Sequence, residues 1–531
     1  MSLGKVIFHI DVNSAFLSWE AVYRLHHLGW KGDLREQVSA VGGDMAMRHG
    51  IILAKSIPAK KYRIQTGESI LEAKQKCPNL ILVPPNYGLY ERCSKAFMGI
   101  LQEYSPAVEQ YSIDEAFVDM TGTELLWGTP VEAAEKMRRQ IKERLGFTVN
   151  IGISENKLLA KMASDFQKPD RVHTLWKSEI RNKMWPLPVS DLFFVGRATT
   201  KTLFKLGIRT IGDLAKSNPG YLKQHLKKHG EVIWGFANGI DVSVVQSAPP
   251  ANKGYGNSTT IPFDVTDAST AKLVLLALAE TVGSRLRGAG VRAEVIAVGI
   301  KNYDLSYASH QMTLQNATNI TKEIHQCACQ LFDQLWDGTP IRHLGIHTSR
   351  IKDQVNMRQL DLFDTNDYEK LEKMDETIDQ IRKRYGNDSV IRAAFLGGCI
   401  DHMSGGISRE KRSVDYEKLK TDSGKGEETV AFGIGINTEH TEQEPLSGTY
   451  HEVAVQCWFT ATGKSLPLML KVKGEDEEII QINHIQVLTV EKQWYAGIVN
   501  WKYRCQAVLL GKQINFVLLF CPEDCAWKLV V

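Results

Sequence analysis

The chain has no run of 18 or more apolar residues, and its first residues do not form a basic segment followed by an apolar one. We therefore expect neither a membrane-spanning helix nor a secretory signal peptide. Its nine cysteines are scattered, and no group of them has the spacing of a four-ligand zinc site. An odd number of cysteines without a disulfide framework indicates reduced thiols, so we expect a cytoplasmic protein. The sequence shows no internal repeat.

The composition is that of an ordinary globular protein, with 43% hydrophobic and 24% charged residues. A chain of 531 residues is too long for one core and predicts about three to five domains. The net charge of +3 is unevenly spread, because residues 421–531 hold 9 basic and 14 acidic side chains and the first 420 residues carry +8. A positive body favours a phosphate-rich partner, although many soluble proteins share such an asymmetry.

Two adjacent carboxylates, Asp114 and Glu115, stand inside a short apolar segment, and a third, Asp11, ends a matching apolar run. Burying carboxylates is costly unless a cation or hydrogen bonds compensate. Adjacent side chains of a strand point to opposite faces, so both can reach one cation only at a strand end or tight turn. Three carboxylates on two neighbouring strands suit two Mg²⁺ ions, which prefer oxygen ligands. For the Asp-Glu pair alone, a helix N-cap with a solvated neighbour is the alternative.

Four segments, in the right order and spacing, resemble signatures of the Y-family of DNA polymerases, the lesion-bypass enzymes of the DinB and UmuC type. They are Asp11-Val12-Asn13-Ser14-Ala15-Phe16, Ser112-Ile113-Asp114-Glu115-Ala116-Phe117, the segment 152–161 and the segment 164–169. The resemblance covers about residues 5–365, and its first motif is closest to the bacterial UmuC-like branch. It implies an α+β multidomain, right-hand polymerase with palm, small fingers, helical thumb and little finger.

The resemblance and the composition together divide the chain into segments. We expect a palm at 1–31 and 86–186, fingers at 32–85, a thumb with a helix-hairpin-helix at 187–240, a linker at 241–256, a little finger at 257–353, a clamp-binding peptide with a helical extension at 354–402, a linker at 403–446, and a small, mostly β domain of unknown role at 447–531.

Hydrophobic spacing predicts the elements within these segments. In the first 186 residues we expect helices at 15–28, 91–103 and 130–145, strands at 38–41 and 147–151, and a basic turn-helix region at 55–76. In the little finger we expect a β-α-β-β-α-β order with strands near 255–265, 292–302, 305–314 and 342–351 and helices at 268–288 and 318–336. A helix is predicted from 368 to about 384, and apolar runs at 452–459, 468–472 and 514–520 predict strands.

The family resemblance implies that Asp11, Asp114 and Glu115 are the catalytic metal ligands, with the backbone carbonyl of Val12 as a further ligand. Two Mg²⁺ ions per active site would hold the attacking and leaving oxygens of nucleotidyl transfer. The same resemblance makes Phe16 a steric gate that fills the space a ribose 2′-hydroxyl would need. Taken alone, a phenylalanine in an apolar helix is more often part of the core.

Nucleotide binding is expected at three lysines: Lys60 and Lys61 match the fingers motif, and Lys168 matches the second phosphate-binding position. A Lys-Lys pair on a helix is otherwise a solvated face. Ile57 stands where DinB-type enzymes have tyrosine, so one hydrogen bond to the triphosphate is in doubt.

Two further segments point to macromolecular partners. Gly196, Arg197 and Thr199 lie in a region that resembles a helix-hairpin-helix, where a helix N-terminus can approach a DNA phosphate; an ordinary helical hairpin is the alternative. Gln359-Leu360-Asp361-Leu362-Phe363 resembles the bacterial sliding-clamp binding peptide, and the alternative is a local packing anchor.

We therefore expect a DNA-directed DNA polymerase for translesion synthesis, of low fidelity and without proofreading. No exonuclease constellation is visible in the sequence. Its partners would be primer-template DNA, deoxynucleoside triphosphates, the β sliding clamp and, as an open question, an accessory subunit of the UmuD type. The alternatives are a non-catalytic DNA-damage scaffold that binds DNA and the clamp, and a nucleotidyl cyclase built on a similar palm, which the thumb and little-finger regions disfavour.

Overall fold

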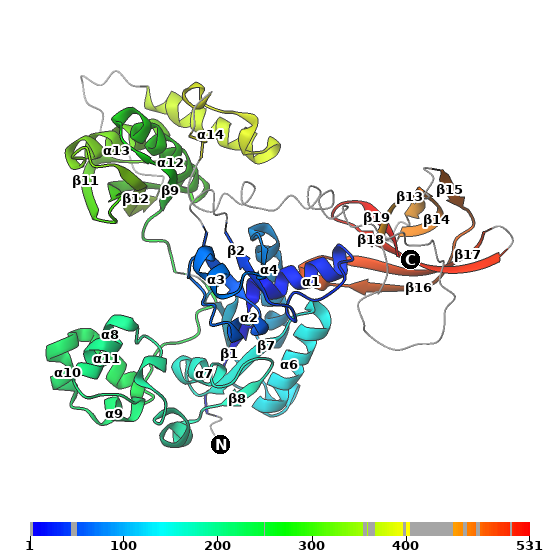
Figure 1. Cartoon of the computed structure of the whole chain (residues 1–531), viewed down its shortest axis with the longest axis horizontal. Helices are drawn as coiled ribbons and strands as arrows, with labels where there is room; N and C mark the ends of the chain where they lie inside the picture. Colours follow the sequence, from blue (N-terminus) through cyan, green and yellow to red (C-terminus); the bar gives the residue numbers. More distant parts are fainter. Residues whose placement is uncertain are drawn as a thin grey trace.

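The computed structural model describes residues 4–43, 50–248, 250–353, 358, 367–396, 400–403, 450–459, 465–473, 478–509 and 512–530. Figure 1 shows that the chain folds into several separate domains, with the C-terminal sheet beside the central α/β domain. No helix in these ranges combines the length and the apolar character that a membrane crossing needs.

The central body, the palm, is built on a five-stranded sheet with β1 in its middle. The strands run in the order β5 (Val108–Gln110), β6 (Glu115–Asp119), β1 (Ile7–Val12), β7 (Val149–Ser154) and β8 (Val172–Thr174). β1 is antiparallel to both neighbours, β6 and β7. All six residues of β1 are buried, which matches the apolar run seen in the sequence.

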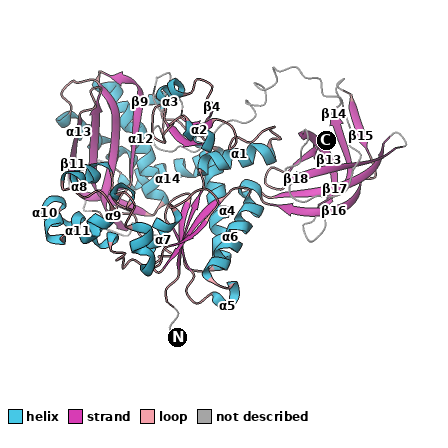
Figure 2. Ribbon diagram, turned by 60° about the horizontal axis from the view of Figure 1, so that its bottom comes forward, coloured by secondary structure: helices cyan, strands magenta, loops and turns pink. Residues whose placement is uncertain are grey.

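Helices cover both faces of the palm sheet (Figure 2). The main apolar cluster joins the sheet to α1 (Ala15–His27), α4 (Tyr87–Tyr104) and α6 (Pro130–Leu145). The helix α7 (Lys157–Ser164) packs on β1 and β7. Glycine is needed at position 152 of β7, because a Cβ there would stand 2.0 Å from the carbonyl oxygen of Ala160.

Local signals explain why α6 has the predicted bounds. Thr129 caps its first turn in a capping box with Glu132, and Pro130 occupies the first helical position. Gly146, at φ 80°, ends the helix in the left-handed conformation.

Two smaller bodies flank the palm, the fingers and the thumb. The fingers hold a three-stranded sheet, and the thumb is helical. The fingers consist of β2 (Ser39–Gly42), β3 (Ile52–Lys55), α2 (Ile57–Lys61), α3 (Ile70–Lys76) and β4 (Ile81–Val83), and the thumb consists of α8 (Arg197–Lys205), α9 (Ile211–Lys216), α10 (Pro219–Leu226) and α11 (Lys228–Ala237). The short helix α5 (Glu124–Trp127) lies between β6 and α6 of the palm, and η1 (Lys177–Glu179), η2 (Ile180–Met184) and η3 (Val189–Asp191) lie between β8 and α8.

The little finger confirms the predicted β-α-β-β-α-β order. Its elements are β9 (Gly256–Val265), α12 (Ala268–Gly288), β10 (Val291–Asn302), β11 (Tyr307–Thr318), α13 (Thr321–Leu335) and β12 (Ile341–Asp353), and the sheet order is β11-β10-β12-β9. Both helices share one apolar cluster with the sheet.

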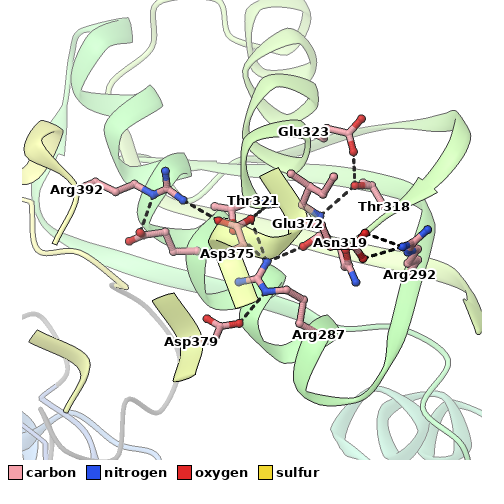
Figure 3. Close-up of polar contacts among 12 residues, drawn as sticks. Arg287, Arg292, Thr318, Asn319, Thr321, Glu323, Glu372, Asp375, Asp379 and Arg392 are labelled. Carbon is pink, nitrogen blue, oxygen red and sulfur yellow. Dashed lines mark hydrogen bonds and ion pairs between the residues drawn. The ribbon is translucent and has the colours of Figure 1, made fainter. Parts of the chain in front are cut away.

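A buried ionic network fastens the next helix, α14 (Tyr368–Tyr385), to the little finger (Figure 3). Arg287 of α12 donates to Asp379 at 2.7 Å and to Asp375 at 3.3 Å. Arg392, beyond α14 and between the short turns η4 (Asn387–Ser389) and η5 (Ala393–Phe395), donates to Asp375 at 3.1 Å. Because Arg287 and Asp375 are almost fully buried, each depends on two oppositely charged partners to offset the cost of burying its charge.

The C-terminal body is a seven-stranded antiparallel sheet, which contains the three strands predicted from the apolar runs at 452–459, 468–472 and 514–520. Its order is β15 (Ile479–Ile482), β14 (Ser465–Lys473), β13 (Tyr450–Phe459), β19 (Ala526–Val530), β18 (Lys512–Cys521), β17 (Asn500–Leu509) and β16 (Gln486–Gln493). The pairings make the two edge strands, β15 and β16, run in the same direction. Only residues 483–485 join them, and parallel pairing needs a much longer crossover, so the sheet stays open there.

Two sequence predictions fall wholly or mostly outside the described residues: the clamp-binding peptide, Gln359 to Phe363, and the linker at 403–446. The prediction for the fingers was incomplete. The strand β3, which precedes and ends at the start of the region expected to be basic turn and helix, was not predicted, and that region holds two short helices, α2 and α3.

Candidate active site

Three carboxylates meet at one end of the palm sheet, as the sequence predicted. Asp11 lies directly opposite Glu115 in the β1–β6 register. Asp114 comes just before β6, and its carbonyl accepts a hydrogen bond from the Val12 N–H at 3.0 Å. Asp114 thus lies just outside the strand, so its side chain is not forced to the face opposite that of Glu115, as it would be within a regular strand. The helix N-cap alternative is wrong, because the pair opens a strand.

Hydrogen-bond donors hold each carboxylate. Lys168 donates to Asp11 at 2.5 Å, Lys161 donates to Glu115 at 2.8 Å, and the Ser112 hydroxyl donates to Asp114 at 2.7 Å. With these partners in place, no three acidic, histidine or cysteine side chains of the described residues are grouped as a ready metal site.

The charge balance at Asp11 nevertheless fits a cation. Burial raises the pKa of Asp11 to about 6; Lys168 lowers it in part, and the neighbouring Glu115 and Asp114 raise it further. Burial alone would lower the pKa of Lys168, but the carboxylates of Asp11 and Asp165 raise it above its ordinary value. Two lysines therefore face three carboxylates, so a negative charge remains, and the oxygen donors of the cluster suit a hard divalent cation.

A cleft of about 910 Å³ opens beside the carboxylates, between palm and fingers. Of the residues predicted from the sequence, its lining includes Asp11, Val12, Phe16, Lys60, Asp114 and Lys168. Lys61 is exposed and is absent from the lining. Ile57, which replaces the family's tyrosine, lines the cleft and is 48% exposed.

The cleft also holds basic residues that the sequence reasoning missed. Lys55, Arg35 and Lys142 belong to its lining. Lys55 ends β3 and donates to the carbonyl of Ile64 at 2.5 Å. Burial and the neighbouring Lys60 lower the pKa of Lys55. The sequence signal for this residue was the apolar run Ile52–Ala54 that it terminates.

Phe16 sits in the first turn of α1 and is held by aromatic stacking. Its ring lies parallel to that of Tyr90, with centroids 4.5 Å apart and planes 8° apart. Tyr90 is fully buried on α4, and its hydroxyl donates to Glu20 of α1 at 3.0 Å. Helices α1 and α4 together therefore fix the ring that faces the cleft.

In the thumb, the predicted DNA contacts gather at the start of α8. Gly196 is its N-cap, Arg197 is its first residue, and no side chain caps its first turn. An added Cβ at Gly196 would meet nothing within 4 Å. The first N–H groups of a helix have no partner within the helix. Thr199 is half-buried and lies 3.5 Å from His229 through its hydroxyl oxygen.

Comparison with known proteins shows to which family the chain belongs. Family models match residues 10–165 (impB/mucB/samB family), residues 177–208 (IMS family HHH motif) and residues 252–362 (impB/mucB/samB family C-terminal domain). The chain belongs to the impB/mucB/samB family, the Y-family of DNA polymerases.

The relatives carry a more particular name. A "DNA polymerase IV" of Clostridium acetobutylicum is 44% identical over 394 residues, which are 74% of this chain and 99% of that protein. A "DNA polymerase IV 2" of Bacillus subtilis (strain 168) is 36% identical over 404 residues, 75% of this chain and 96% of that protein. These names lend no support to the predicted UmuC-like branch.

A solved structure shares the fold. A Y-family DNA polymerase chimera of Dbh and Dpo4 superposes with a TM-score of 0.57 at 22% sequence identity, over 66% of this chain and 99% of that one. The predicted polymerase fold class, including the helix-hairpin-helix, is therefore confirmed. A quarter of the chain lies outside the relatives' matches, and the family models end at residue 362.

Proposed function

We propose that this protein is a template-directed DNA polymerase that carries out translesion synthesis, with low fidelity on undamaged template and without proofreading. The observation that carries the proposal is the placement of Asp11, Asp114 and Glu115 at one sheet end, beside a cleft that is also lined by Phe16, Lys60 and Lys168. Family membership and the polymerase IV names of the relatives support it.

The metal ligands in this proposal are Asp11, Asp114, Glu115 and the backbone carbonyl of Val12, and the metal is Mg²⁺, two ions per site. Bound Mg²⁺ would favour the ionised form of the primer 3′-hydroxyl and offset charge on the leaving pyrophosphate. Lys168 and Lys161 now neutralise Asp11 and Glu115, so ion binding would compete with these two contacts. Lys168 is then available to the triphosphate.

The remaining residues of the cleft bind and select the nucleotide. Lys60 and Lys168 would pair with phosphate oxygens as point charges. The ring of Phe16, fixed by Tyr90, would occupy the space beside the sugar and exclude a 2′-hydroxyl. Lys61 is exposed beside this site and is the natural comparison for Lys60.

Primer-template DNA would lie across the positive body, with the α8 N-terminus at Gly196, Arg197 and Thr199 close to a backbone phosphate. Running-start extension on a template with one abasic site, compared with the same template undamaged, tests the translesion part of the proposal. We expect products beyond the lesion. Efficient copying of the undamaged strand with a full stop at the abasic site would support the polymerase activity and contradict bypass of that lesion.

Replacing Lys60 or Lys168 by alanine is expected to lower kcat/KM for nucleotide by roughly 10- to 150-fold, since each charge-assisted contact contributes about 1.5–3 kcal/mol. Lys61→Ala is the matched control and should stay close to the wild type. Steady-state nucleotide titrations measure both, alongside duplex affinity, which should not change. Equal losses at Lys60 and Lys61 would contradict the different placement of the two side chains.

Exchanging Leu362 and Phe363 together for alanine is expected to abolish stimulation of synthesis by the sliding clamp. A few buried apolar anchors dominate such contacts, and these two residues are the anchors of the proposed peptide. Arg358, the residue that precedes the peptide, pairs with Glu323, and its guanidinium lies 3.3 Å from the centre of the Tyr368 ring. Distributive extension should persist, because the changes lie outside palm, fingers and thumb.

The C-terminal sheet could bind the clamp itself and mask this loss. A chain shortened after Met403 is therefore measured in parallel, with and without the double change, and each protein is compared with its own extension in the absence of the clamp. Clamp stimulation that survives the double change in both lengths would show that Gln359 to Phe363 is not the tether.

A further inference from the structure

The tip of the β16–β17 hairpin is buried in the palm, although the hairpin belongs to the C-terminal sheet. The tip is the turn Tyr495–Gly497, and Ala496 at its centre is 0% exposed. Ala496 and Ile498 belong to the main apolar cluster of the palm, together with Trp19 and Tyr90. The turn contacts α1, α4 and α6. Figure 1 shows β16 and β18 reaching from the C-terminal sheet to the end of α1.

Polar contacts fix the turn on the last residues of α1. With its proton on Nε2, His27 donates to the carbonyl of Tyr495 at 2.9 Å and accepts from the Asn500 amide at 3.0 Å through Nδ1. The ring of Tyr495 stacks on His26 with centroids 3.7 Å apart. Lys528 of β19 donates to the carbonyl of His27 at 2.9 Å. One tautomer of His27 therefore satisfies both contacts of its ring.

The turn fits α4 closely in shape. Gly497 has φ 73°, and a Cβ there would stand 2.6 Å from the carbonyl oxygen of Arg92. The thiol of Cys93 donates to the carbonyl of Ala496 at 3.2 Å. Beside the turn, the Arg92 guanidinium pairs with Glu523 of the β18–β19 turn at 3.2 Å. Only glycine meets both the backbone conformation and the close approach at position 497.

The same two helices hold the ring of Phe16. Phe16 is the second residue of α1, whose other end, at His27, contacts the turn. Tyr90, on which Phe16 stacks, precedes Cys93 by three residues on α4, which is about one helical turn. A contact that joins the end of α1 to the middle of α4 therefore limits how the two helices can shift relative to each other.

We propose that the Tyr495–Gly497 turn is a positioning element for sugar selection: it fixes α1 against α4 and so keeps the Phe16–Tyr90 stack in place. The proposal rests on the steric-gate role proposed above for Phe16. The family models end at residue 362, so the Tyr495–Gly497 turn lies outside the polymerase domains that they describe.

The test uses the full chain with Gly497→Val, whose side chain would clash with the Arg92 carbonyl, and with the milder Tyr495→Ala, which removes the stack on His26. Trp458→Ala is the control, because Trp458 is 65% exposed on the same sheet. For each protein, kcat/KM is measured for a deoxynucleotide and for the matching ribonucleotide. We expect the deoxy-to-ribo ratio to fall several-fold in both turn variants and to stay at the wild-type value in the control.

The ratio separates positioning from folding. A stability role alone would lower both efficiencies together, so an unchanged ratio in Tyr495→Ala overturns the proposal, whether or not Gly497→Val folds. Phe16→Ala, measured in the same series, separates the role of the turn from the role of Phe16 itself. If Phe16→Ala changes the ratio and the turn variants do not, the turn has no positioning role and Phe16 remains the steric gate. If Phe16→Ala leaves the ratio unchanged, Phe16 is not the steric gate.

Discussion

Asp114→Ala is expected to abolish primer extension while leaving the affinity for primer-template DNA nearly unchanged. The substitution removes one of three carboxylates from the sheet end and does not touch the basic surfaces. Loss of a residue that only orients a metal ligand typically costs about 10- to 100-fold in activity, so loss of a ligand should cost more. Single-nucleotide incorporation and fluorescence anisotropy on the same duplex measure the two quantities.

Asp119→Asn provides the matched control for this change. Asp119 is the last residue of the same strand, β6, lies opposite Ile7 at the far end of the β1 pairing, and is not part of the cleft lining. Its variant should extend primers at close to the wild-type rate. Substantial extension by Asp114→Ala would contradict the assignment of the metal ligands.

Phe16→Ala is expected to raise ribonucleotide insertion relative to deoxynucleotide insertion by more than about 10-fold, a difference of about 1.4 kcal/mol. The reason is steric, because the ring lines the cleft and Tyr90 prevents it from moving aside. Phe16→Tyr keeps the ring and should keep most of the discrimination. Competing insertion of the two sugars opposite one template base gives the ratio directly, and an unchanged ratio would make Phe16 a core residue only.

Elements with strong local signals could be predicted from the sequence almost to the residue. The helix α6 follows from its capping box and its terminal Gly146, and α12 has the predicted bounds at 268–288 because Asp267 caps its first turn. The meeting of Asp11 with Asp114 and Glu115 was also predicted, because the resemblance to the Y-family motifs implies a shared metal site for these carboxylates. Here the local pattern and the tertiary structure agree.

Contacts between distant residues could not be predicted in this way. The pairing of Lys161 with Glu115 joins residues 46 positions apart, and that of His27 with Tyr495 joins residues 468 positions apart. The strand β3 was missed, and with it the position of Lys55 at the end of that strand, beside the cleft. The burial of the turn at Ala496 was not predicted either, because it comes from contacts with α1, α4 and α6, which are distant in the sequence.

The most direct measurement of the central claim is incorporation of single nucleotides opposite each template base by the purified full chain, with Mg²⁺ present, removed by a chelator and restored. We expect incorporation that follows the template base, stops on chelation and returns with Mg²⁺. A folded protein that binds the duplex but adds no nucleotide under any of these conditions would contradict it, and would favour the non-catalytic scaffold instead.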